Sequence, residues 1–206
     1  MAAIVASPTA MAAIWRSNSA VAAVQKNTTA WKTFTGATSA VMGKTVAILA
    51  NLNPADYADM TAVAASQTAM AAVIGNATAL NAVVSSSTAM AAVAASKVAT
   101  GAIAASATAL AKIAGSTTAL DALYAKKSRL TGASTSKSGK FIILQISSNS
   151  AFSTSQYGYA TLSDGSQPDW GSYLSKYAYF KQFKMVATFI KNDTESDDWI
   201  DYFPCG

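Results

Sequence analysis

The stretch SSSTAMAAVAAS at residues 85–96 contains a ten-residue phrase that recurs along the first three-fifths of the chain. In each copy a hydroxyl residue and an alanine precede a large apolar residue, and a second apolar residue follows three positions later. The first apolar column holds Met11, Val21, Trp31, Val41, Met60, Met70, Leu80, Met90, Leu110 and Leu120, and the second holds Ile14, Val24, Phe34, Val63, Val73, Val83, Val93, Ile103, Ile113 and Leu123. A fixed period of this kind is typical of repeat architectures, in which no unit buries its apolar face alone.

The spacing and composition of the repeat favour α-helix, because alanine, methionine and leucine are good helix formers and a three-residue step lies on one helical face. Ten residues turn a helix by about 1000°, which is about 80° short of three turns. A continuous helix would therefore need strong supercoiling to keep its apolar stripe. The alternative is a break in every repeat, as at Gly36–Ser39, Gly75–Thr78 and Gly115–Thr118, where glycine ends one helix and a hydroxyl residue caps the next. We expect short stacked helices in preference to a coiled shaft, and we interpret the threonine column as helix N-caps.

The repeat region is predicted to span residues 1–128 and to be interrupted near 43–59, where the first apolar column slips by one position. Within the interruption Asn53 is expected to be an N-cap, with Pro54 at the first helical position. The first block is bulkier than the second, so it is a candidate docking surface or a better-filled core. The residues predicted to mediate assembly are Trp15, Trp31, Phe34, Met70, Leu80 and Met90.

The composition changes after Arg129. Residues 129–140 are rich in serine, threonine and glycine and are predicted to be a linker. Residues 141–206 are predicted to form a small β-rich domain, with strands at Phe141–Ile146, Tyr157–Leu162, within Tyr177–Ile190 and at Trp199–Phe203. The predicted fold class is α+β in two segments, an all-α repeat region followed by a β-rich domain.

Composition excludes several classes of function. Only 12% of the residues are charged, against about 25% in typical soluble domains, which indicates surface buried between copies and hence a homo-oligomer, a trimer being favoured. The chain has no histidine, so Ser-His-Asp and Cys-His catalysis and most zinc chemistry are excluded. We expect no enzymatic activity, no cofactor and no metal. The net charge of +5 is diffuse and no apolar run has the length of a membrane span, so we expect neither nucleic-acid binding nor membrane insertion.

Three smaller patterns have ordinary explanations. Gly43-Lys44-Thr45 resembles the end of a phosphate-binding loop, but the glycine required five positions earlier is Thr38, so we interpret the match as coincidence. The carboxylates Asp193, Glu195, Asp197, Asp198 and Asp201 lack the spacing of a calcium loop and are predicted to form a solvated acidic turn. The single cysteine, Cys205, is expected to be a tolerated thiol; the alternative is a disulfide between chains.

The last 66 positions are dense in tyrosine and tryptophan, which are enriched at binding surfaces. About half of them are expected in the core of the β-rich domain. The predicted recognition residues are Trp170, Tyr173, Trp199 and Tyr202, with a cell-surface glycan as the expected ligand.

The phrases SSSTAMAAVAAS (Ser85 to Ser96) and ASATALAKIAGSTTAL (Ala105 to Leu120) resemble the alanine-rich STAM-type repeats of tail-fibre and other virion structural proteins of tailed bacteriophages. The resemblance covers the repeats alone and transfers no functional residue. It implies a virion component, made in the host cytoplasm, with other virion proteins as partners, an assembly-forming shaft and a domain facing the host. The predicted function is a tail-fibre or baseplate-associated protein for adsorption. A head fibre or capsid decoration protein, a bacterial surface adhesin and a polysaccharide depolymerase are the alternatives.

Overall fold

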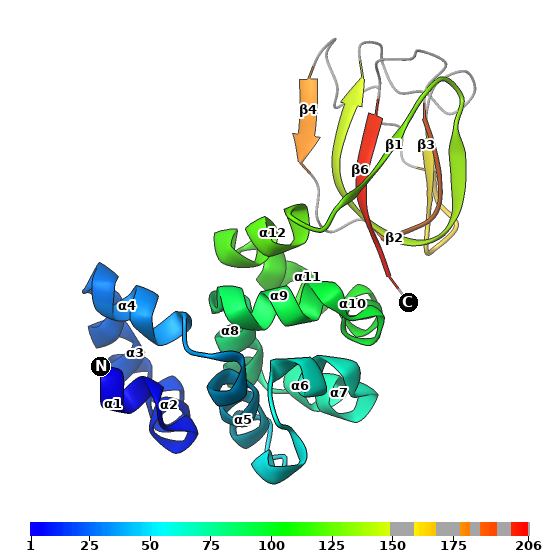
Figure 1. Cartoon of the computed structure of the whole chain (residues 1–206). Helices are drawn as coiled ribbons and strands as arrows, with labels where there is room; N and C mark the ends of the chain where they lie inside the picture. The colour runs from blue at the N-terminus through cyan, green and yellow to red at the C-terminus, as the bar shows by residue number, and fades with distance from the viewer. Residues whose placement is uncertain (149–158, 168–177, 182–185, 193–198, 206) are drawn as a thin grey trace. The chain divides into compact units, whose positions relative to one another are not determined.

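The computed structural model describes residues 1–148, 159–167, 178–181, 186–192 and 199–205. The chain divides into two compact units, Met1–Leu123 and Tyr124–Gly206, which we call the helical unit and the β unit. The predicted fold class, α+β in two segments, is confirmed: short helices make up the first unit and an antiparallel sheet the second (Figure 1).

The helical unit consists of short helices that break at every repeat, as the stacked alternative predicted. Their bounds are α1 (Ala2–Val5), α2 (Pro8–Trp15), α3 (Asn18–Gln25), α4 (Thr28–Thr35), α5 (Ser39–Leu49), the 3₁₀ turn η1 (Pro54–Asp56), α6 (Met60–Ala65), α7 (Gln67–Gly75), α8 (Ala77–Ser85), α9 (Ser87–Ala95), α10 (Lys97–Ala104), α11 (Ala107–Ala114) and α12 (Thr117–Tyr124). The axes bend by 105° between α7 and α8 and by 96° between α9 and α10. Over the described residues no single helix has the length and apolar content of a membrane span, although these two bent pairs reach both when each pair is taken together.

Most repeats start with an N-cap two positions before the threonine column, whereas α5 is capped by Thr38, one position before Ser39. In α9 the backbone N–H of Ala89 donates to Ser86 Oγ at 3.2 Å, and Thr88 is already the second helical residue. The interpretation of the threonines as caps was therefore wrong for these repeats. Serine or asparagine at the earlier position is extended in backbone conformation and bonds the N–H three residues on, which satisfies a donor that the helix leaves free.

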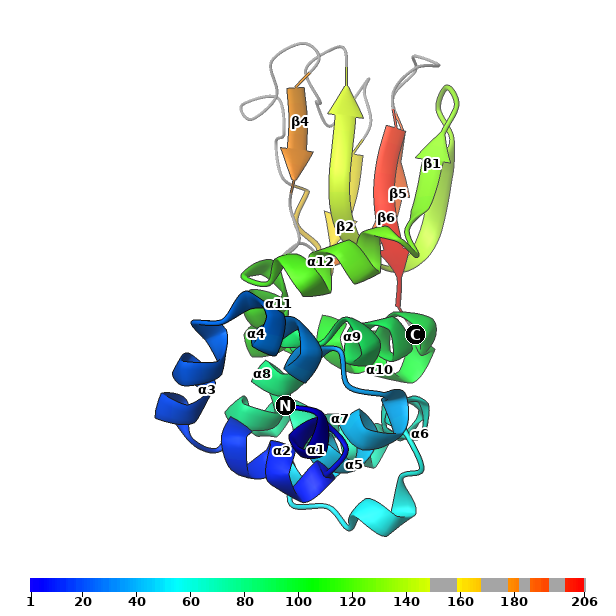
Figure 2. The same ribbon diagram turned by 60° about the vertical axis from the view of Figure 1, so that its left-hand side comes forward.

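In the second block three helices each lie on the helix three places earlier in the chain: α9 on α6, α10 on α7 and α11 on α8. Figures 1 and 2 both show α9 and α10 above α6 and α7. Because α-helices as short as these are unstable alone in water, this stacking provides their stability. The large residues of both apolar columns point inward, and Met70, Val73, Met90 and Val93 are at most 1% exposed.

Two capping serines also join successive turns of the stack. The hydroxyl of Ser96 accepts from the N–H of Ala99 and donates to the carbonyl of Ala64, 32 residues earlier, at 2.6 Å. Ser116 donates in the same way to the carbonyl of Val84, also 32 residues earlier and at 2.6 Å. One hydroxyl thus satisfies a free N–H at the start of its own helix and a free carbonyl near the end of an underlying helix.

The interruption lies at residues 50–59, between α5 and α6, rather than at 43–59. Asn53 is an N-cap as predicted and Pro54 follows it, but the pair opens only the single turn η1. Asp59 caps α6, accepting from the N–H of Ala62 at 2.9 Å. Gly43 lies inside α5, where a Cβ would overlap the backbone of Asp59 and Met60. The Gly-Lys-Thr triplet therefore belongs to a close contact of α5 with the start of α6, and it is not a phosphate loop.

The β unit is a six-stranded antiparallel sheet. Its strands are β1 (Ser128–Thr131), β2 (Ser136–Ser148), β3 (Tyr159–Leu162), β4 (Ala178–Lys181), β5 (Val186–Lys191) and β6 (Trp199–Pro204). The order is β1-β6-β2-β5-β3, and β4 pairs with the end of β2. Every strand predicted from the sequence has a counterpart, and the segment Tyr177–Ile190 contains β4 and most of β5.

The predicted linker at residues 129–140 was wrong, because β1 and the start of β2 occupy it. Arg129 pairs with Asp201 of β6, and Ser136 pairs with Lys191 of β5. The turn between the strands has positive φ at Gly132 and Ser134. Serine, threonine and glycine indicate a linker only when no neighbouring strand offers a backbone ladder, and here two strands do.

The core on one face of the sheet contains Phe141, Ile143, Ala160, Ala187, Ile190, Ile200 and Tyr202. The rings of Phe141 and Tyr202 pack edge to face with centroids 4.9 Å apart. Ile142 and Leu144, which point to the opposite face of β2, are each 1% exposed. The central strand is therefore buried on both faces, which explains its continuous apolar run.

Candidate functional site

Three aromatic side chains pack together in the first block of the helical unit. The ring centroids of Trp15 and Phe34 lie 5.2 Å apart, those of Trp15 and Trp31 5.8 Å, and those of Trp31 and Phe34 6.1 Å. Phe34 is fully buried and Trp15 is 5% exposed, whereas Trp31 is half-buried. The cluster therefore holds Trp31 from beneath while part of its indole remains at the surface.

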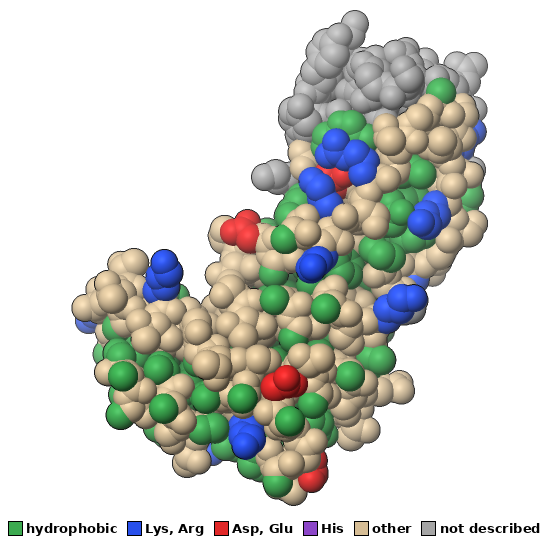
Figure 3. Space-filling view, viewed as in Figure 1, with side chains coloured by type: hydrophobic (Ala, Val, Ile, Leu, Met, Phe, Trp, Pro, Cys, Tyr) green, Lys and Arg blue, Asp and Glu red, His purple; other side chains and the backbone are tan. Residues whose placement is uncertain are grey.

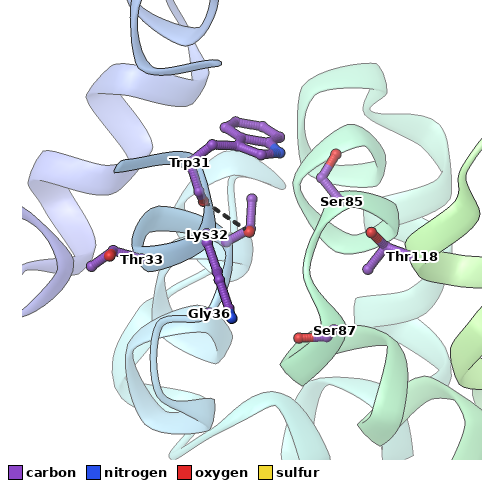
Figure 4. A pocket seen from close by; sticks show the side chains of 8 residues that line it. Trp31, Lys32, Thr33, Gly36, Ser85, Ser87 and Thr118 are labelled. Atoms are coloured by element: carbon purple, nitrogen blue, oxygen red, sulfur yellow. Dashed lines mark hydrogen bonds between the residues drawn. The ribbon is translucent and has the colours of Figure 1, made fainter. Parts of the chain in front are cut away.

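An open groove of about 580 Å³ runs from α4 to the facing helices α8, α9 and α12. Figure 4 shows the Trp31 indole at one end and the Lys32 side chain running along α4, with its nitrogen beside Gly36 at the edge of the gap. The groove is lined by Trp31, Lys32, Thr33, Thr35, Gly36, Ser85, Ser87 and Thr118. The volume lies within the range of about 300–1,000 Å³ that is usual for ligand sites.

The facing walls of the groove carry different chemistry. One wall offers an aromatic surface and a cation, Trp31 and Lys32 of α4. The opposite wall carries the hydroxyl groups of Ser85, Ser87 and Thr118 (Figure 4). Thr35 donates its hydroxyl hydrogen to the carbonyl of Trp31 at 2.9 Å, so its oxygen keeps only acceptor capacity toward a ligand. No carboxylate is among the lining residues.

The first block of the helical unit carries only positive side-chain charges. Residues 1–55 contain Arg16, Lys26, Lys32 and Lys44 and no aspartate or glutamate, and all four cations are exposed. On the face drawn in Figure 3, the charged side chains of the helical unit are separated by hydrophobic and neutral surface. The cations therefore act as separate charges, and Lys32 is the one that lines the groove.

The residues predicted to mediate assembly lie mostly in the interior of one chain. Trp15, Phe34, Met70, Leu80 and Met90 are at most 5% exposed. Only Trp31 keeps a surface that another molecule can contact. The reason is the stacking of helices three places apart, which buries both apolar columns within a single copy.

Of the predicted recognition residues, only Trp199 and Tyr202 lie within the described part of the chain. Trp170 and Tyr173 lie outside the described residues. Tyr202 was wrongly predicted to be a surface residue, because it is 3% exposed and packs in the sheet core. Trp199 is half-buried, with the guanidinium carbon of Arg129 3.7 Å from its ring centroid.

Asp201 is the centre of an ion-pair cluster rather than part of a solvated acidic turn. Its side chain is 0% exposed, and it accepts from Arg129 Nε at 2.6 Å and from Arg129 Nη2 at 2.9 Å. Lys127 Nζ lies 2.9 Å from its second oxygen. The prediction of a solvated turn was wrong for this residue because β6 places it opposite Arg129. The other four carboxylates, Asp193, Glu195, Asp197 and Asp198, lie outside the described residues.

Two titratable groups of the β unit have a raised pKa, which keeps each of them protonated and neutral. Burial, with a contribution from the charge of Asp201, raises the pKa of Tyr124, whose hydroxyl donates to the carbonyl of Leu144 at 2.8 Å. Burial raises the pKa of the Cys205 thiol to about 11. Within the described ranges, no three histidine, cysteine, aspartate or glutamate side chains gather as a metal site would require.

The groove was not predicted from the sequence. Lys32 and Thr118 are 86 positions apart in the chain, and nothing in either repeat marks the two as neighbours. Only the stacking order of the helices brings α4 opposite α8, α9 and α12. No family model matches the chain, and no curated protein has significant sequence similarity to it.

Proposed function

We propose that this protein is a structural component of a tailed-bacteriophage virion, associated with the tail fibre or baseplate, that assembles as a homo-oligomer through its helical unit. The β unit then serves for adsorption to the host surface. The resemblance of Ser85–Ser96 and Ala105–Leu120 to virion repeats supports the class of protein. The observation that carries the assembly step is the unburied face of α3.

The helix α3 contains no buried residue, although it has the same apolar columns as its neighbours. Val21 and Val24 are half-buried, whereas Met70 and Val73, at the same positions of α7, are 1% and 0% exposed. The cause is the interruption at residues 50–59, after which α6 packs chiefly on α5 and α9, so that α3 contacts mainly α2 and α4.

A repeat array that ends without a polar capping face leaves apolar surface in water. The half-exposed valines of α3 are such a surface, and low overall charge adds little to keep separate copies apart. Burying them against another copy or another virion protein removes that surface from water. This supports association through the first block, for which the sequence left a docking surface and a better-filled core as alternatives.

Light scattering on the purified full chain at micromolar concentration tests the assembly step. We expect an oligomer, and we expect Val24→Lys to dissociate it because a charge would have to enter the contact. Ala23→Lys is the matched control, since Ala23 is an exposed neighbour on the same helix. A monomeric native chain, or equal effects of the two lysines, would contradict assembly through α3.

Antibody labelling of virus particles from lysates that contain the chain tests the virion assignment. Label on the tail supports the proposal, and label on the capsid would favour a head fibre or decoration protein. Label found only with bacterial envelopes would contradict the virion assignment. Binding of the full chain to a glycan array, with Trp170→Ala as the test variant, examines the adsorption role of the β unit.

A further inference from the structure

We propose that the groove between α4 and helices α8, α9 and α12 is a binding site for an acidic saccharide. The proposal concerns the helical unit alone and does not depend on the virion assignment or on the β unit.

The aromatic wall suits the ring of a sugar. A pyranose ring exposes C–H groups on its faces and hydroxyl groups at its edge. Trp31 is half-buried and is held on its inner side by Trp15 and Phe34, so the part that lines the groove is a supported flat surface. A preorganised aromatic ring provides contact area with little loss of side-chain entropy.

The opposite wall suits the edge of the same ring. Ser85, Ser87 and Thr118 place hydroxyl groups across the gap from Trp31 and Lys32 (Figure 4). A hydroxyl both donates and accepts, so such a wall matches sugar hydroxyls whatever their orientation. An apolar peptide segment would leave these groups without partners, which disfavours it as a ligand.

The charge of the groove favours an acidic sugar over a neutral one. Lys32 is the only charged residue that lines the groove; Asp121, one helical turn after Thr118 on α12, is exposed but is not among the lining residues. Gly36 has no side chain, and in Figure 4 the nitrogen of Lys32 lies beside it at the edge of the gap. An ammonium in this place pairs with a carboxylate on the sugar by a charge-assisted hydrogen bond.

Titration of the ¹⁵N-labelled full chain with trigalacturonate, followed through the indole N–H signals of its four tryptophans, tests the proposal. Trp31→Phe assigns the signal of the groove. We expect a saturable shift of the Trp31 signal and no shift of the Trp170 and Trp199 signals. Maltotriose, a neutral saccharide of equal length, is expected to bind several-fold more weakly.

The matched pair Lys32→Gln and Lys26→Gln separates the groove from general charge, because both remove one exposed lysine from the same block. Loss of Lys32 is expected to weaken binding about three- to fivefold, as for an exposed ion pair. Loss of Lys26 is expected to leave the dissociation constant within about twofold, because screening weakens charges that lie outside the groove.

Four results would overturn the proposal. These are the absence of a saturable Trp31 shift in the folded chain, equal effects of the two lysine variants, equal binding of maltotriose, and displacement of trigalacturonate by an equal concentration of inorganic phosphate. Shifts confined to Trp170 and Trp199 would place saccharide binding in the β unit. That result would support the adsorption role proposed for the β unit while removing the groove from consideration.

Discussion

The hydroxyl of Ser96 is expected to contribute more to stability than the other capping hydroxyls, because it bonds in two directions. It accepts from Ala99 N–H at 3.2 Å and donates to the carbonyl of Ala64 at 2.6 Å. Ser106 occupies the same position in the next repeat and accepts from Ala109 N–H at 3.2 Å. Among the described residues Ser106 has no bond to an earlier turn, so the two serines form a matched pair.

The expected magnitudes follow from these bonds. Ser106→Ala removes one N-cap, which costs about 1 kcal/mol. Ser96→Ala removes a cap and also leaves the Ala64 carbonyl without its donor, which adds about 1–1.5 kcal/mol. We therefore expect Ser96→Ala to lower the free energy of unfolding by about 2–2.5 kcal/mol.

Replacing Ser96 or Ser106 with aspartate is expected to change the free energy of unfolding in opposite directions. A carboxylate still accepts from the helix N–H and is favoured by the helix dipole, so Ser106→Asp is expected to be neutral or stabilising by a few tenths of a kcal/mol, on the order of 0.3. At position 96 the carboxylate cannot donate to the Ala64 carbonyl and places negative charge beside it. Ser96→Asp is therefore expected to destabilise by about 2 kcal/mol or more.

Urea unfolding of the full chain, followed by far-ultraviolet circular dichroism, measures these differences, because helix content reports on the helical unit. The slope with denaturant should be unchanged and the midpoint should move. If Ser96→Asp and Ser106→Asp shift the midpoint equally, the bond between turns has no energetic role and the reasoning fails.

Three further predictions rest on single contacts. Gly43→Ala is expected to lower the free energy of unfolding by about 3 kcal/mol or more, because its Cβ would overlap the backbone of Asp59 and Met60. Gly75→Ala is the control, since a Cβ at that position meets nothing within 4 Å, and thermal melts of both variants should show it to be neutral or stabilising. Arg129→Met should lower stability by about 2–3 kcal/mol because it leaves the fully buried Asp201 with Lys127 alone, and calorimetry should show part of the loss recovered in the double variant Arg129→Met, Asp201→Leu. The Cys205 thiol, with its pKa raised by burial from 9.0 to about 11, should react with a disulfide reagent at pH 8 far more slowly in the native chain than in urea. Since the native chain keeps that proton while the unfolded chain loses it, stability should fall as the pH rises from about 9 to about 11, and a pH series of melts that shows no such fall would contradict the burial of the thiol.

The ten-residue period favoured a break in every repeat over a continuous coiled shaft, because ten residues do not complete a whole number of helical turns and because glycine and serine recur at the junctions. The choice between the two forms came from the structure. The position of the cap was predicted two residues late, since threonine and serine both have capping hydroxyls and only the backbone conformation distinguishes them. The β-branched runs likewise predicted the strands of the β unit.

Tertiary structure decided the features that join distant parts of the chain. The groove combines Lys32 with Thr118, and the cluster at Asp201 combines residues of β1 and β6. The 129–140 segment became strand because β5 and β6 offered backbone partners to residues that favour linkers by composition. Local sequence fixes which residues begin a helix or suit a strand, because those choices depend on bonds within a few residues. Which helix lies on which depends on the burial of both apolar columns at once, and that becomes defined only when the helices are stacked.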